Sequence, residues 1–567
     1  MVLCLIFELL GALTVGARSA STIKNGIIPV SAFKDDAGVQ LLAFACASAG
    51  ASIWVMWCTR HSAHVSSTYS LISSLAGVGV ATVGAGGVQW GWNKGTGLGA
   101  IFAGLAMAPA ISGAFAAITF MLVKLVVHMR KNPVPWAVWT SPFFFLIAGT
   151  VCTLSIVYKG SPNLKLNAKP AWYIASVTVG CGVGLFLLSA LFFVPYVHAK
   201  VVKKDYTLKL RHVIYGPLLF KRPAPADAEE AKVPNYAVIQ HDEEGSQSGE
   251  EQLDLGSPEL KSSDLKNTKD SVVPQYDQHH ASDKKLILAE CNQQGYQRLM
   301  AEALEKHHAR LRAGRGPLAW AMRTLHENPM GAGSIHETAN IITFFKRAPA
   351  LLVAALLYGA HYDIHTAQVG IEGTPEGRRM ARVYDHAEKY PNEVEYLYSF
   401  VQIITACTAS FAHGANDVGN AVGAWAVMYA AWSTGEAAKK KTPVPVWQIA
   451  VMALTICIGF ITYGYNIMKV MGNKITYHSP SRGSSMELGA AITVLIFSQY
   501  SLPVSTSMCI TGATVGVGLC NGTLKAVNWK RVGLLVFSWF MTIPIAGLIG
   551  GCTMGILLNS PHFQSKQ

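Results

Sequence analysis

Apolar runs long enough to cross a membrane follow one another in both halves of this chain, and a long polar stretch separates the two sets. In the first half the runs lie near 1–17, 39–58, 65–84, 98–128, 138–158 and 171–197, and in the second near 396–431, 446–468, 486–520 and 531–558. Runs of this length predict membrane helices. The 567 residues are 51% hydrophobic and only 14% charged, whereas soluble proteins carry about a quarter charged residues. The pattern predicts an all-α polytopic membrane protein with about 10–12 membrane segments.

The composition changes at His198, after the last run of the first half. A basic cluster follows, opposed only by Asp205: Lys200, Lys203, Lys204, Lys209, Arg211, Lys221 and Arg222. Basic residues beside membrane segments mark the cytosolic side, so we predict a large cytosolic insert. If the insert is cytosolic, Lys439, Lys440 and Lys441 fall on the opposite side of the membrane, against this tendency. The orientation of the protein in the membrane therefore stays open.

The insert divides by composition. Residues 223–282 are rich in Glu, Asp, Ser, Lys and Pro, which predicts disorder. Residues 285–325 predict one or two surface helices, and 344–362 predict a helix at the membrane interface rather than a span. The pattern His-Tyr-Asp-Ile-His at 361–365 is interpreted as a solvated turn, because nothing nearby completes a metal site. The predicted domains are a first membrane repeat (1–197), a partly disordered cytosolic loop with amphipathic helices (198–395) and a second membrane repeat (396–567).

A polar cluster lies near the middle of the run from 396 to 432. Asp417 stands there between Asn416 and Asn420, and a carboxylate inside a membrane is costly enough to indicate a functional site. Asn416 and Asn420 share one helix face, and His413 and Asp417 share a neighbouring one. Glycines at 414, 419 and 423 allow another backbone to approach closely. The alternative is a polar packing seam between helices.

The sequence matches itself when it is shifted by 439 residues. Without a gap from 50 to 90, Gly50 meets Gly489, Ser66 meets Ser505, and Trp90 meets Trp529. Two related halves with a binding site between them are typical of secondary transporters, so we predict inverted repeats with re-entrant or broken helices. The matched region contains a hydroxyl cluster in each half, Ser66-Ser67-Thr68 and Ser505-Thr506-Ser507. Hydroxyls at the start of a half-helix suit an oxyanion, although they also bond back to carbonyls within a helix.

These segments resemble the signatures of the inorganic phosphate transporter (PiT) family. Residues 411–420, read as FAHGANDVGN, resemble its G-[AS]-N-D-V-x-N motif, above all in the fungal sodium-coupled members. Residues 503–508 resemble its P-[VI]-S-[ST]-T-H motif, with Met508 in place of histidine. The first copy, residues 64–69, lacks both the proline and the histidine. The segments around Glu8 and Glu487 resemble family segments that carry membrane glutamates.

The resemblance implies a sodium-coupled inorganic phosphate symporter of the plasma membrane, and a homodimer. It implies no enzyme, no cofactor beyond the co-transported sodium ion, and no nucleic-acid partner. Phosphate needs hydrogen-bond donors, whereas carboxylates suit a hard cation. The expected cation ligands are Asp417, Glu487 and Glu8. The expected phosphate-binding residues are Asn416, Asn420, Ser66, Ser67, Thr68, Ser505, Thr506 and Ser507.

This interpretation leaves three alternatives, and the sequence departs from the family pattern in one respect. Protons could replace sodium, because His413 and Asp417 can titrate, and the loop could serve a phosphate sensor or scaffold. A hydrolase built from Ser505, His413 and Asp417 is disfavoured, because a His and an Asp at i and i+4 of one helix suit a triad poorly. The family carries the acid–amide motif in both repeats, but the 439-residue shift places the partner of Asn416 before Met1. We therefore expect the first repeat to lack its start and the chain as given to be incompetent for transport.

Overall fold

The computed structural model describes residues 2–61, 63–92, 97–158, 169–205, 207–225, 307–330, 338–357, 375–439, 444–464, 474–500 and 502–560, together with 305 and 442. Within these residues the protein is helical, and the only strand-like pairing is one isolated bridge between Thr476 and Val527. The all-helical expectation is therefore confirmed. The segment predicted to be disordered (223–282) and the His-x-Asp-x-His pattern lie almost entirely outside the described residues.

Helices from both halves of the chain build the bundle. The helices of the first half are α1 (Val2–Val15), α2 (Ala17–Asn25), α3 (Ala37–Arg60), α4 (Ser67–Val83), α5 (Leu98–Val123), α6 (Pro133–Val157), α7 (Ala171–Leu188) and α8 (Val194–Val197). Those of the second half are α14 (Asn392–Thr434), α15 (Val446–Thr462), α17 (Pro480–Gln499), α18 (Thr506–Leu519) and α19 (Trp529–Asn559). Between the halves lie η9 (Leu210–Lys221), α10 (Pro317–Glu327), α11 (Thr338–Leu357) and α13 (Pro375–Asp385).

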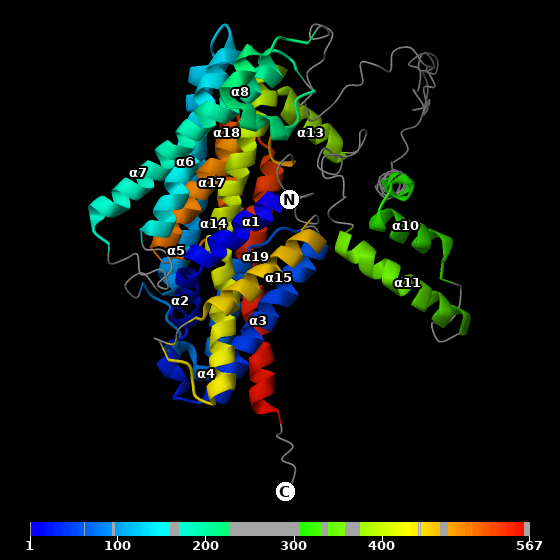
Figure 1. The fold of residues 1–567 in the computed structure, drawn as a ribbon. Helices are drawn as coiled ribbons and strands as arrows, with labels where there is room; N and C mark the ends of the chain where they lie inside the picture. The colour runs from blue at the N-terminus through cyan, green and yellow to red at the C-terminus, as the bar shows by residue number, and fades with distance from the viewer. Residues whose placement is uncertain are drawn as a thin grey trace, which may run out of the picture.

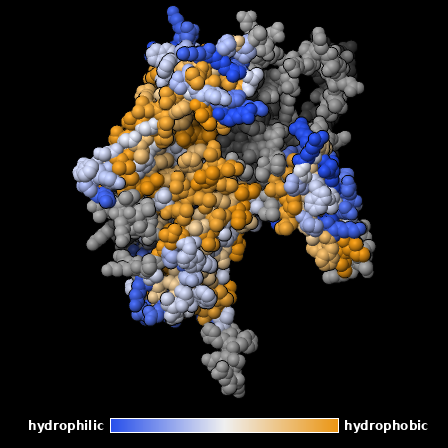
Figure 2. Space-filling view, in the orientation of Figure 1, coloured by the Kyte–Doolittle hydropathy of each residue, from blue (hydrophilic) through white to orange (hydrophobic). Residues whose placement is uncertain are grey.

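The surface of the bundle fits a bilayer. Figure 2 shows a broad apolar band around its middle and hydrophilic residues gathered at its two ends. Large apolar side chains exposed on the bundle include Trp57, Ile118, Leu187 and Phe540. In the described part of the chain, five helices are long and apolar enough to cross a membrane, or six if α1 and α2, which meet at 62°, form one bent span. The expected 10–12 segments are reached only by adding the shorter or more polar helices α4, α14, α15, α17 and α18.

Helix α14 runs through the centre of the bundle from one end to the other (Figure 1). It begins after Pro391, with two acidic residues in its first turn, and stops at Gly435, whose φ of 70° ends the helix in a left-handed conformation. Helices α1, α2, α3 and α17 pack along it. Because α14 touches elements of both halves, its polar face lies inside the protein rather than against lipid.

The two halves exchange helices. The 439-residue shift relates α3 to α17, α4 to α18 and α5 to α19. Helices α3, α4 and α19 pack together as one group, and α17, α18 and α5 pack together as the other, so each group contains one helix of the opposite half. Glycines permit this exchange: a Cβ at Gly77 would overlap the carbonyl of Gly547, and one at Gly516 would overlap the carbonyl of Gly113.

One local expectation was wrong. The apolar run 486–520 is not one segment, because the chain leaves the helix at Tyr500 and starts a new one at Thr506. Pro503 between them has no N–H to continue a helix, and Ser505 caps the new one. The polar stretch from Thr22 to Asp36 is helical as far as Asn25, because the polar face of α2 is buried against α14 rather than exposed to water.

Candidate functional site

The polar cluster of α14 is buried at the centre of the bundle. Asn416, Asp417 and Asn420 are 2%, 9% and 9% exposed, respectively. The glycines on this helix make the burial possible: a Cβ at Gly414 would overlap the carbonyl oxygen of Glu8 in α1, and one at Gly419 would overlap Ser19 in α2. Because α1 and α2 close one side of α14, its acid and amides face the remaining helices.

Each hydroxyl cluster lies at the start of a half-helix, as the repeat predicts. Ser66 caps α4 by accepting a hydrogen bond from the backbone N–H of Tyr69 (3.2 Å), and Ser505 caps α18 in the same way from Met508 (3.4 Å). The two starts adjoin, since the hydroxyl oxygen of Thr68 lies 3.4 Å from the carbonyl oxygen of Val504. The positive ends of two helix dipoles therefore converge beside Asp417.

Asp417 joins the two half-helices. Its Oδ2 accepts a hydrogen bond from Thr506 of α18 (2.8 Å), and its Oδ1 accepts one from Thr68 of α4 (3.5 Å). Asn420 donates to the same Oδ1 (3.1 Å) and to the hydroxyl of Thr68 (2.9 Å). One carboxylate thus accepts from hydroxyls of both sequence repeats, which satisfies a charge that would otherwise be very costly to bury.

Asn416 stabilises the break in the chain between α17 and α18. Its amide donates to the carbonyl of Val504 (2.6 Å), and its carbonyl oxygen accepts from Ser498 (3.4 Å). Pro503 leaves the helix open at this point, so the amide replaces a bond that the backbone cannot make. The remaining predicted hydroxyls differ in environment: Ser507 lies 3.0 Å from Ser505, whereas Ser67 is exposed.

Glu8 and His413 extend the cluster toward α1. Nδ1 of His413 lies 2.5 Å from Oε1 of Glu8, and its Nε2 lies 3.3 Å from Oδ2 of Asp417. The imidazole therefore stands between two carboxylates, with 40% of its side chain exposed. A ring in this position links Glu8 to Asp417 through its two nitrogen atoms.

Glu487 lies apart from the other acids. It accepts hydrogen bonds from Thr405 (2.6 Å) and Gln402 (3.1 Å), which are also on α14. Thr405 precedes Asp417 by 12 residues, or about 18 Å along the helix axis. The structure therefore does not bring Glu487 into the cluster around Asp417 and gives it a polar pocket of its own.

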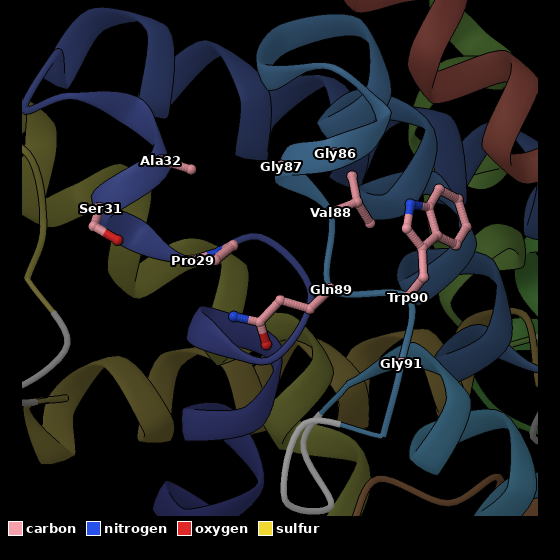
Figure 3. A pocket seen from close by; sticks show the side chains of 9 residues that line it. All are labelled: Pro29, Ser31, Ala32, Gly86, Gly87, Val88, Gln89, Trp90 and Gly91. Carbon is pink, nitrogen blue, oxygen red and sulfur yellow. The ribbon is translucent and has the colours of Figure 1, made fainter.

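A surface pocket lies elsewhere and contains none of the predicted site residues. Figure 3 shows it between the loop at Pro29–Ala32 and the glycine-rich segment Gly86–Gly91, with the side chain of Gln89 beside it. None of its lining residues carries a charged side chain, so we assign it no part in the chemistry of the cluster.

The comparisons with known proteins agree with this arrangement. The profile of the phosphate transporter family matches residues 1–550. The chain belongs to the phosphate transporter family. It is 35% identical to the phosphate-repressible phosphate permease pho-4 of Neurospora crassa over 99% of this chain and 91% of that protein. It is 26% identical to human sodium-dependent phosphate transporters 1 and 2, over 98% of this chain and 90% and 92% of theirs.

The fold agrees as well. A solved structure entitled "The sodium-dependent phosphate transporter" superposes with a TM-score of 0.56 at 20% identity, covering 98% of this chain and 89% of that one. The protein is thus a multi-pass membrane phosphate transporter and not an enzyme.

The structure also recruits residues that were not expected from the sequence. Ser498 contacts Asn416, and Gln402 and Thr405 hold Glu487. Gln402 and Thr405 stand three residues apart in an apolar run, so a search for polar pairs on one helix face could have found them. Ser498 carries no such signal, because a lone serine in a helix usually bonds to its own backbone.

Proposed function

We propose that this protein couples the uptake of inorganic phosphate to sodium at the plasma membrane. One observation carries the proposal: a buried carboxylate, Asp417, accepts hydrogen bonds from the starts of two half-helices that belong to different repeats. Relatives named sodium-dependent phosphate transporters support the choice of sodium. Family resemblance also suggests a homodimer.

Phosphate would bind where hydroxyls and free backbone N–H groups converge at the starts of α4 and α18. An anion there gains donors from helix N-termini without an arginine or lysine contact. We assign this role to Asn416, Asn420, Ser66, Ser67, Thr68, Ser505, Thr506 and Ser507. The amides now donate to Val504 and Thr68, so they contribute to phosphate binding by exchanging those bonds.

Sodium would bind at Asp417, because hard cations prefer carboxylate, hydroxyl and carbonyl oxygens. Glu8 contributes through His413, and Glu487 supplies a second acidic position, about 18 Å away along the axis of α14. A cation held between Asp417 and phosphate converts their repulsion into attraction. The two substrates then bind more tightly together than separately, which is the thermodynamic requirement for symport.

The test is uptake of radiolabelled phosphate by the full chain in sealed proteoliposomes at fixed pH. The proposal predicts uptake with an inward sodium gradient and little uptake when choline replaces sodium, whereas the expectation of a chain incompetent for transport predicts no uptake in either. Equal uptake in choline would refute sodium coupling. Empty liposomes and an unlabelled sulfate competitor give the background and the anion selectivity.

A second candidate is proton coupling, favoured by the position of His413 between Glu8 and Asp417. The same proteoliposomes distinguish it: an inward proton gradient without sodium would drive uptake, and His413→Gln would remove that uptake. Under the sodium proposal, a proton gradient alone drives none.

A further inference from the structure

Helices α10 and α11 form a pair beside the bundle with a face that no described residue covers. The pair contacts the bundle where α11 meets α15 (Figure 1). Arg347 of α11 donates to the carbonyl of Asn328 at the end of α10 (2.6 Å), which fastens the two helices together. This pair belongs to the segment between the two membrane halves and plays no part in the cluster around Asp417.

The exposed face of α11 is its most apolar one. Ile342, Phe345, Pro349 and Leu352 follow the spacing i, i+3, i+7 and i+10, which places them on a single stripe. Ile342, Phe345 and Leu352 are 53%, 70% and 63% exposed. Ala350 and Asn340, on the opposite side, are buried. A surface helix normally turns its apolar face toward the protein and its polar face toward water. The exposed apolar stripe of α11 therefore requires an apolar partner.

The charge of the pair identifies that partner. The described residues 305, 307–330 and 338–357 contain six basic side chains, Arg310, Arg312, Arg315, Arg323, Lys346 and Arg347, against two acidic ones, Glu305 and Glu327. Glu305 already pairs with Arg312. Trp320, Arg323 and Lys346 are all exposed. A helix with aromatic and aliphatic residues on one face and basic residues beside it suits a membrane surface rich in anionic lipids.

The position of the pair agrees with this partner. Figure 2 shows apolar side chains at the far end of the pair as well as on the neighbouring band of the bundle. Since α11 contacts α15, a helix of the same bundle, the stripe can enter the outer part of the bilayer that surrounds the bundle. A soluble protein partner would not explain why the apolar stripe lies next to the bilayer and beside basic side chains.

We propose that the α10–α11 pair is a site for anionic phospholipids, with the stripe of α11 inserted among acyl chains and the basic residues on the headgroups. The site would clamp the insert to the membrane next to α15. It would also make the position of the insert depend on the lipid composition of the leaflet it faces.

Hydrogen–deuterium exchange of the full chain in nanodiscs tests the proposal. We compare peptides from 338–357 in nanodiscs of phosphatidylcholine alone and of phosphatidylcholine with about 30% phosphatidylglycerol, at about 0.15 M salt. Exchange should slow by roughly tenfold or more in the anionic nanodiscs, because each basic side chain near the surface adds roughly fivefold to partitioning. Peptides from α3 serve as the internal reference.

Two variants separate the contributions. Arg323→Gln with Lys346→Gln should remove most of the difference between the two lipids, whereas Lys34→Gln with Lys131→Gln, which are exposed basic residues elsewhere, should leave it intact. Ile342→Ser with Phe345→Ser should restore fast exchange in both lipids. Equal exchange in neutral and anionic nanodiscs would overturn the proposal, and so would slow exchange that persists in the Ile342→Ser/Phe345→Ser variant, because the face would then be covered by protein.

Discussion

Replacing Asp417 with asparagine should abolish phosphate uptake while leaving the protein folded and in the membrane. The two side chains have nearly the same shape, and an asparagine retains one acceptor for Thr506 (2.8 Å) or Asn420 (3.1 Å). One donor loses its partner, which costs roughly 1–3 kcal/mol of folding free energy. Such a loss is tolerable in a bundle whose core is otherwise intact.

The effect on the cation is larger. Two unit charges about 4 Å apart attract each other by about 4 kcal/mol at an effective dielectric constant of about 20. Removing the charge of Asp417 should therefore weaken cation binding by roughly a thousandfold, since about 1.4 kcal/mol corresponds to a factor of ten. Even very high sodium concentrations would not restore the wild-type rate.

The assay is phosphate uptake as a function of sodium concentration, normalised to the amount of protein in the membrane, with thermal unfolding of the purified variant as the folding check. Asp385→Asn, a change at an exposed acid on α13, is the matched control and should transport normally. If Asp417→Asn reached the wild-type rate at the same sodium concentration, Asp417 would not bind the cation and the coupling argument would fail.

Three further predictions concern the hydroxyls at the start of α18, the close contact at Gly414 and the buried carboxylate of Asp205. Ser505→Ala and Thr506→Val each remove a hydroxyl at the start of α18 and should raise the phosphate concentration for half-maximal uptake by roughly tenfold or more; unchanged values in both would make these hydroxyls purely structural. Gly414→Ala should lower stability in a thermal-unfolding assay by about 1–3 kcal/mol, because its Cβ would overlap a backbone carbonyl. Gly180→Ala, at an open helix position, should not lower it. Burial alone would raise the pKa of Asp205, but its hydrogen bonds and arginine partner outweigh this and lower it from 3.8. The stabilisation is therefore complete above pH 3.8 and is lost as the pH falls through the lowered value. The protection factors of residues 198–222, which compare observed exchange with the intrinsic rate at the same pH, should therefore fall in acid. Asp205→Asn should show raised exchange already at neutral pH.

Much of the site was predictable because it depends on local rules. The pairing of Ser66 with Ser505 by the 439-residue shift predicted two half-helix starts, and both serines are N-caps. The isolated acid of Asp417 in an apolar run predicted a buried polar centre, since a lipid-facing carboxylate would be too costly.

Other features could not be read from the sequence because they depend on which surfaces meet in space. The exchange of α5 and α19 between the halves relies on the contact of Gly77 with Gly547, more than 400 residues away. The separation of Glu487 from Asp417 is set by the pairing of α17 with α14, whose register no sequence pattern specifies.

The exchange of helices also governs how the protein is made. Helix α4 packs against α19, the last helix of the chain, and Gly50, Ser74 and Gly77 lie at that contact. During synthesis the sides of these residues that face Gly547 and Gly550 have no partner until residues 529–559 have entered the membrane. Helix α4 therefore stays incompletely packed until α19 has been inserted. Loss of α19 should disrupt the hydroxyl cluster at the start of α4 as well as the second half of the protein. Folding of the group formed by α3 and α4 is therefore complete only when α19 has packed against them.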